Sequence, residues 1–280
     1  AGLCMAPFLL VVWIFAGQYK KIVTSMGARK ARSDYKLERL SASGPRSALL
    51  KKELKRVFGT PIYFLNAGLG LLLLAAGGVA CLVFRGQVGE FLSLTQGMLP
   101  VMPLLALVMA FLLSTTEITA SSISLEGRQL WILREAPVSA GELFLVKTGM
   151  QMLVTLPCLL VGVICSAVAT GVDAGSTVLL LGLGLLFSGV MAQGGLLANL
   201  CFPKLDAPND TVVVKQSASV LITIFGSWVL LAIFGFGYAL LLSQLGETVG
   251  LLIVAAVCAL LNLVLWRLLA TVGIKLFRDL

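Results

Sequence analysis

The chain has 280 residues and a formal net charge of +8, and it is 59% hydrophobic but only 12% charged. A soluble domain usually has about 25% charged residues, and its core cannot hide so much apolar surface, whereas lipid can. The composition therefore excludes an ordinary soluble domain. The chain also has no histidine, the commonest general base and zinc ligand, so neither a catalytic nor a metal site is expected.

The apolar residues fall in seven blocks that predict membrane-spanning helices. A helix needs about 20 residues to cross about 30 Å of hydrocarbon, and lipid offers the backbone no partner outside a helix. The six internal blocks hold 23 to 25 residues each and are long enough. We therefore predict an all-α, polytopic transmembrane bundle of about seven spans, one followed by a six-span domain over 61–271. The blocks are 1–17, 61–84, 93–116, 148–170, 176–200, 219–243 and 248–271.

The basic residues alternate from loop to loop and predict the orientation. Every Lys and Arg except Arg85 lies in every second segment between the blocks or at the C-terminal end. Cytoplasmic loops carry such an excess, whereas a nucleic-acid-binding patch predicts no alternation, so no nucleic-acid partner is expected. The segments predicted to be cytoplasmic are 18–60, 117–147, 201–218 and the C-terminal end with its tail 272–280; the loops near 85–92, 171–175 and 244–248 are predicted to face outward.

The N-terminal part of the chain is interpreted as the end of an upstream unit. Block 1–17 is short, but it lacks the basic start and the small-residue cleavage site of a signal peptide. An outside-to-inside span truncated at its start fits better, and the chain is expected to be a fragment of a longer protein. Residues 18–45 are polar and basic and end in the run SASGP, which is typical of a flexible linker.

Residues 46–60 are predicted to contain an amphipathic helix at the membrane surface. Its apolar residues fall within about 100° of arc at 100° per residue, and its cations occupy the other side. Such a helix lies in the interface with its cations toward lipid headgroups; a solvated basic stretch is the alternative. The apolar set is Leu50, Leu54, Val57 and Phe58, and the cations are Lys51, Lys52, Lys55 and Arg56.

The polar loops have their own predicted structure. In 117–147, residues 128–135 form a short helix that Pro137 stops. Ser139 and Glu142 then have the S-x-x-E spacing of a capping box, which starts a helix that runs into the next span. In 201–218, two prolines interrupt the helix, and Asn209, Asp210 or Thr211 caps a new helix after them. Asp206 and Asp210 are interpreted as part of a solvated network rather than as a metal site.

The spans carry no ionisable residue near any block centre, which argues against a proton-coupled transporter or ion pump. Their amides are expected to hydrogen-bond between helices, and small residues spaced by four form a face for close helix packing. Prolines are expected to kink two spans, and the six cysteines are interpreted as small buried hydrophobes. The amides are Asn66, Gln96, Gln151, Gln193, Asn199 and Asn262; the small residues are Gly184, Ser188 and Ala192; the prolines are Pro100, Pro103 and Pro157.

No catalytic motif is present. The sequence contains no G-x-x-x-x-G-K-[ST] phosphate loop, no G-x-S-x-G and no H-E-x-x-H, so the chain is not itself an ATPase or another enzyme of these classes.

Three polar stretches resemble a known family, the bacterial type-2 ATP-binding-cassette exporter permeases in their two-repeat form. They are SALLKKELKRVFGTPIYFLNAGLG at 47–70, ISLEGRQLWILREAPVSAGELFLVK at 123–147 and FPKLDAPNDTVVVKQSASVL at 202–221. The second is the most specific, because Glu126-Gly127 precedes Trp131-Ile132 and Pro137-Val138. The resemblance covers about 61–271 with the amphipathic helix in front, and this chain resembles the C-terminal half.

The resemblance implies a permease of an exporter in a bacterial cell membrane. Segment 46–60 looks like the connecting helix, and 123–142 looks like the coupling helix that docks on a separate ATPase subunit. The chain itself would bind no cofactor; ATP and Mg would act through that partner, and substrate would pass between this chain and its upstream half or a second permease copy. The residues implied in coupling are Glu126, Arg128, Trp131, Ile132, Arg134 and Glu135.

The residues alone leave alternatives open. Trp131 is either an anchor in a groove of the partner or an interfacial anchor at headgroup level. A non-transporting membrane scaffold remains an alternative to the permease, since it also needs no charge at the midplane. A secondary transporter is a weaker alternative.

Overall fold

The computed structural model describes residues 44–94 and 100–280, and in these ranges the chain is helical and contains no strand. The expected span at 1–17, the linker up to residue 43 and Gln96 lie outside the described residues. The helices are α3 (Pro45–Gly59), α4 (Pro61–Ala67), α5 (Leu69–Val83), α6 (Arg85–Leu94), α7 (Val101–Ser114), α8 (Leu130–Glu135), α9 (Ala140–Thr170), α10 (Ala174–Cys201), α11 (Asp210–Gln216), α12 (Ala218–Gly237), α13 (Glu247–Leu268) and α14 (Ile274–Asp279). Short 3-10 turns are η1 (Thr119–Ser121), η2 (Ser124–Gln129) and η4 (Ser243–Leu245), and π-turns are η3 (Tyr238–Leu242) and η5 (Leu269–Gly273).

Five helices of the described chain are long and apolar enough to cross a membrane, and a sixth candidate is the pair α4 and α5, which is bent by 63°. The protein is therefore a multi-pass membrane protein of helical build. One candidate runs over Val101–Glu135 and begins with the apolar helix α7. Helix α9 has 31 residues and is about 46 Å long at 1.5 Å per residue, so it extends beyond the hydrocarbon.

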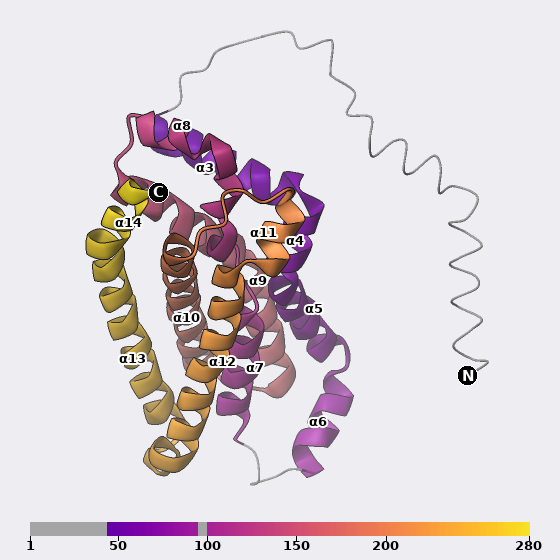
Figure 1. Ribbon diagram of the computed structural model, residues 1–280. Helices are drawn as coiled ribbons and strands as arrows, with labels where there is room; N and C mark the ends of the chain where they lie inside the picture. The colour runs from indigo at the N-terminus through magenta and orange to yellow at the C-terminus, as the bar shows by residue number, and fades with distance from the viewer. Residues whose placement is uncertain (1–43, 95–99) are drawn as a thin grey trace, which may run out of the picture. The chain divides into compact units, whose positions relative to one another are not determined.

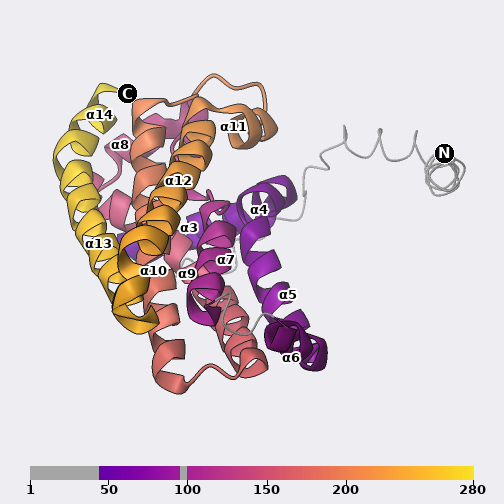
Figure 2. The same ribbon diagram turned by 90° about the horizontal axis from the view of Figure 1, so that it is seen from below.

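Helix α10 forms the centre of the bundle. It packs against α7, α9, α12 and α13, while α5 packs along α9 on the other side (Figures 1 and 2). The contact between α5 and α9 is close because Gly78 lies directly against Gly162. The small-residue face of α10 is buried in this packing: Gly184 lies against Leu159 and Met109, and Ser188 donates a hydrogen bond to Thr155.

The two ends of the bundle differ in charge. Helices α3, α8, α11 and α14 lie at one end, here called the polar end, and α6 with the turns near 171–173 and 243–246 lies at the other (Figure 1). The segments rich in Lys and Arg thus gather at one end of the described chain, as the alternation of loops predicts. Arg85 lies at the opposite end with Glu90, Asp173 and Glu247.

Three boundaries predicted from the sequence are wrong. The predicted outer loop 85–92 is the helix α6, and the predicted span 93–116 begins only at Val101. Pro100 and Pro103 therefore lie at the start of α7 rather than in a kink, since proline is favourable where the amide has no helical partner. The predicted tail 272–280 continues the last helix, because Phe277 is buried against Phe144 with ring centroids 5.9 Å apart.

The predicted helix signals are confirmed. Ser139 Oγ accepts a hydrogen bond from Glu142 N while Glu142 Oε2 accepts one from Ser139 N, which completes the capping box of α9. Asn209 Oδ1 accepts from Val212 N and caps α11. Helix α8 ends at Glu135, before Pro137. Helix α9 contains Pro157, and the kink expected there stays a prediction.

Candidate functional site

A cluster of buried charges joins three segments at the polar end. Lys147 on α9 is fully buried, and its Nζ donates to Glu53 Oε1 at 2.8 Å, to Ser122 O at 3.1 Å and to Glu126 Oε1 at 3.3 Å. Glu53 comes from α3 and Glu126 from η2. We call Lys52, Glu53, Arg56, Glu126 and Lys147 the ion cluster. It fixes the surface helix, the polar loop and a membrane span to one another.

The outer side of the ion cluster consists of two cations of α3. Lys52 Nζ donates to Glu126 Oε2 at 2.8 Å, and Arg56 Nη2 donates to the same oxygen at 2.9 Å. Arg56 Nη1 lies 2.8 Å from Glu126 Oε1, but it makes no directed hydrogen bond there. Three cations thus serve two carboxylates, and the extra positive charge is on the solvent side, where Lys52 remains 41% exposed in its side chain.

The cations around Glu126 compensate the burial of its carboxylate. Burial by itself raises the pKa of Glu126, but the hydrogen bond from Arg56 and the positive charge of Lys147 outweigh it and hold that pKa well below its usual range. Removing a carboxylate from water costs several kcal/mol unless geometry and hydrogen bonds compensate. The cluster therefore depends on all of its members being present.

The amphipathic pattern of α3 places Glu53 in the cluster. Leu49, Glu53 and Val57 recur every four residues and are all buried, so the carboxylate lies on the helix face that packs against α9. Phe58, which the sequence pattern assigns to the apolar face, is 59% exposed. The face that packs on protein is therefore rotated from the predicted arc.

Gly127 makes the turn that brings Glu126 inward. Its φ of 52° and ψ of −135° lie in a region that residues with a Cβ rarely adopt. We expect Gly127→Ala to lower the free energy of unfolding by about 1 to 3 kcal/mol, measured by thermal unfolding in detergent. Gly141→Ala is the matched control, since Gly141 is helical and has open space around it; equal losses from both substitutions would contradict the strain.

The polar run after α7 is buried rather than an exposed loop. Residues 116–124, here called the buried segment, are all buried. Gln151 Oε1 accepts from Thr119 N at 3.0 Å, and Asn199 Oδ1 accepts from Ile123 N at 2.8 Å and from Ser124 N at 3.0 Å. Amides on α9 and α10 thus replace water as partners of a backbone that has no regular helix to satisfy it.

The other amides have different partners. Gln193 Nε2 on α10 donates to Asn262 Oδ1 on α13 at 3.0 Å, and Asn262 Nδ2 donates to Leu186 O. The expectation of bonds between helices therefore fits Gln193, Asn262 and Asn199, whose Nδ2 donates to Ser219 Oγ on α12. Asn66 differs, because its Nδ2 donates to Ile62 O within α4.

The structure separates the six residues predicted to couple to a partner. Glu126 belongs to the ion cluster, with a side chain only 1% exposed, so a direct surface contact is corrected, while its role in coupling stays a prediction. Arg134 Nη2 donates to Arg278 O of α14 at 2.7 Å. All of the six except Glu126 are exposed: Arg128, Trp131, Ile132, Arg134 and Glu135.

The four cations predicted for the interfacial helix are likewise divided. Lys51 and Lys55 are exposed, as expected for cations directed toward headgroups or solvent. Lys52 and Arg56 instead bind Glu126, because an internal carboxylate competes successfully for them. A further ion pair ties the start of α3 to α9, where Arg46 Nε donates to Glu142 Oε1 at 2.8 Å.

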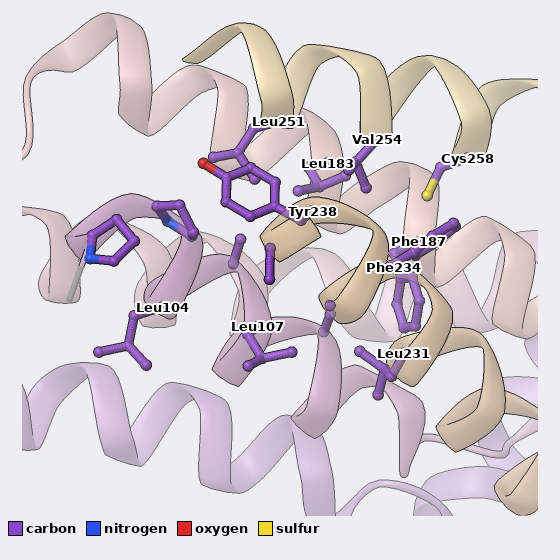
Figure 3. Close-up of a pocket in the computed structure, with 16 residues that line it drawn as sticks. Leu104, Leu107, Leu183, Phe187, Leu231, Phe234, Tyr238, Leu251, Val254 and Cys258 are labelled. Carbon is purple, nitrogen blue, oxygen red and sulfur yellow. The ribbon is translucent and has the colours of Figure 1, made fainter. Parts of the chain in front are cut away.

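An apolar cavity of about 440 Å³ lies between α7, α10, α12, η3 and α13. Its volume is in the range of small-molecule sites, about 300 to 1,000 Å³. Figure 3 shows the Tyr238 hydroxyl among otherwise apolar labelled side chains and the Cys258 thiol. Tyr238 opens the π-turn η3, a distortion that is frequent at functional sites. A neighbouring groove on α7 and α12 shares Leu107 and Leu231 with the cavity.

Sequence reasoning missed Glu53 and Lys147. A signal exists for each: Glu53 falls between Leu49 and Val57 on a helical wheel, and Lys147 directly precedes an apolar block. Their pairing spans 94 residues and has no local signature.

The comparisons with known proteins find no relative. No family model matches the chain, and neither the curated proteins nor the solved structures contain a match.

Proposed function

We propose that the chain is a transmembrane permease of an ATP-binding-cassette exporter that works with a separate ATPase subunit. The observation that carries the proposal is the position of α8. Its Trp131 and Ile132 are 63% and 50% exposed, while the segment directly before it is anchored through Glu126 to α3 and α9. An exposed aromatic on a firmly held base is the arrangement that a docking element needs.

The ion cluster supplies the mechanical link. A push on α8 passes through η2 to Glu126, and from there through Lys147 to α9, a helix that crosses the whole bundle. Packed elements with fixed contacts move as rigid bodies rather than deforming continuously. Movement of the docked ATPase subunit is thereby converted into movement of a span, and ATP and Mg act only through that subunit.

The surface around α8 offers a place for the partner. A groove of about 260 Å³ between α3 and the α8–α9 break is lined by Pro45, Leu49, Leu133, Pro137 and Leu143, with Lys52 beside them. Because the groove is apolar and has a cation beside it, it is suited to bind an apolar side chain of the partner that has an acidic group next to it. Arg128 and Glu135 are exposed nearby in sequence and set the register.

In this proposal the polar end faces the cytoplasm of a bacterial cell, with the protein in the cell membrane. The upstream half or a second permease copy, together with membrane lipid, completes the pathway. The apolar cavity between α7, α12 and α13 supports a substrate with apolar character, because its lining offers little besides the Tyr238 hydroxyl to a polar group.

Trp131→Ala tests the proposal. We expect it to weaken binding of the ATPase subunit by about 30-fold, the effect of losing a hot-spot aromatic worth about 2 kcal/mol, and to uncouple ATP hydrolysis from transport. The measurements are affinity for the ATPase subunit and transport per ATP in vesicles. Phe202→Ala is the control, since Phe202 is a 51% exposed aromatic at the same end but outside α8.

Either of two results would count against the proposal. If Trp131→Ala and Phe202→Ala behave alike, α8 is not the docking element and Trp131 acts as an interfacial anchor. If no ATPase subunit associates with the intact protein, the chain is a scaffold rather than a permease.

A further inference from the structure

Glu117 is a buried carboxyl group that the ion cluster does not include. The residue is 6% exposed, and its Oε1 has no hydrogen-bond partner among the described residues. The other deeply buried acids of the described chain, Glu53 and Glu126, both bind cations. Glu117 follows the end of α7 by three residues.

Glu117 lies at the bend between α4 and α5. Its backbone N–H donates to Ala67 O, the last residue of α4, at 3.1 Å, and the Tyr63 hydroxyl donates to Ile118 O at 2.6 Å. On the other side of the bend, Gly70 is so close to the end of α7 that a Cβ there would overlap Leu112 O. We call this contact of the α4–α5 bend with residues 112–118 the joint.

No described cation compensates a negative charge on Glu117. On the surrounding elements, Lys147 of α9 is bound in the ion cluster and the Tyr63 hydroxyl of α4 is bound to Ile118 O. Asp210 and Lys215 of α11 are exposed, and α5, α7 and α12 carry no charged residue. Burial without a counter-charge favours the neutral acid over the carboxylate.

We propose that the Glu117 carboxyl is a proton-binding site and that the joint opens when this proton is lost. A neutral carboxylic acid is tolerated in the closed joint, whereas an unpaired carboxylate is not, because burying it costs several kcal/mol. Moving the α4–α5 bend away from α7 admits water and removes that cost. This inference does not depend on the proposed transport function, since it needs only the joint itself.

The sign of the pH dependence is set by linkage. In the closed joint the Glu117 carboxyl binds the proton tightly, and in the open joint it has an ordinary carboxyl pKa of about 4.3. The closed state is therefore fully favoured below that value, and it loses stability as pH rises above it. In this window the opening equilibrium increases about tenfold per pH unit, because one proton is released per opening.

Two measurements on the full chain in phosphatidylcholine vesicles test the proposal. Infrared spectroscopy is expected to find a protonated carboxylic acid band at neutral pH that disappears in Glu117→Gln and at alkaline pH, but persists in Glu90→Gln, whose parent residue is exposed at the other end. Hydrogen exchange of residues 61–72 and 115–118 is expected to accelerate in the wild type relative to Glu117→Gln, by about 100-fold from about pH 6 to about pH 8.

Each outcome decides the proposal. A wild-type spectrum without the band at neutral pH, or one that Glu117→Gln leaves unchanged, overturns the proton site. A band with equal exchange in both proteins at every pH overturns the opening of the joint. If Glu117→Gln does not fold, Glu117→Met replaces it as an uncharged side chain of similar length, and the infrared titration of the wild type is read directly.

Discussion

Replacing Lys147 with methionine is expected to lower the free energy of unfolding by about 3 to 5 kcal/mol, because it leaves buried carboxylates without their central cation. Glu53 loses the only ion pair that it makes among the described residues, and Glu126 keeps Lys52 and Arg56. The backbone carbonyl of Ser122 loses its donor as well. Thermal or denaturant unfolding in detergent measures the loss.

A double substitution separates charge from packing in this test. Lys147→Met combined with Glu53→Leu is expected to be more stable than Lys147→Met alone, since replacing both buried partners by apolar side chains is often nearly neutral. Lys55→Met is the control: Lys55 lies on α3 but is exposed, so we expect a change within about 0.5 kcal/mol. A loss in Lys147→Met no larger than in Lys55→Met would mean that the ion cluster does not hold α3 against α9.

Asn199→Ala is the second substitution with a large expected effect, about 3 to 5 kcal/mol. Asn199 is fully buried; its Oδ1 accepts from Ile123 N and Ser124 N, and its Nδ2 donates to Ser124 Oγ and Ser219 Oγ. Each backbone N–H left without a partner costs about 1 to 3 kcal/mol, and the cavity adds to this.

The measurement for Asn199→Ala is again unfolding in detergent, with Asn66→Ala as the matched control. Asn66 is exposed and bonds only within its own helix, so its loss is expected to be small. Because Ile123 and Ser124 lead directly to η2, Asn199→Ala is also expected to accelerate hydrogen exchange around Glu126. Exchange that remains unchanged there would show that Asn199 does not position the ion cluster.

Local features of the sequence predict much of the fold. The apolar blocks give the helical membrane protein, and Ser139 and Asn209 cap the helices that come after them, because capping depends on residues three positions apart. The gathering of Lys and Arg at one end can also be predicted from the sequence, since it needs only the order of blocks and loops. The helix boundaries at 85–101 cannot be predicted in this way, because hydropathy does not distinguish a polar helix such as α6 from a loop.

Only part of the candidate site can be predicted from the sequence. Trp131 and Ile132 are found from their pattern and are exposed as a docking role requires, but Glu126 changes from an expected surface contact to a buried anchor. The apolar pattern of α3 predicts the helix but not which of its faces packs against α9. Its orientation depends on Glu53 meeting Lys147, a pairing that no window of sequence contains.

The sequence alone determined that this chain crosses a membrane as helices, where those helices start with caps, and which end carries the cations. The tertiary structure decided which charges are buried, which partner each one has, and that Glu117 has none among the described residues. The physical reason is the range of the interactions. Transfer to lipid and helix capping act on a residue and its near neighbours, whereas the cost of a buried charge depends on the counter-charge that packing brings from a distant helix.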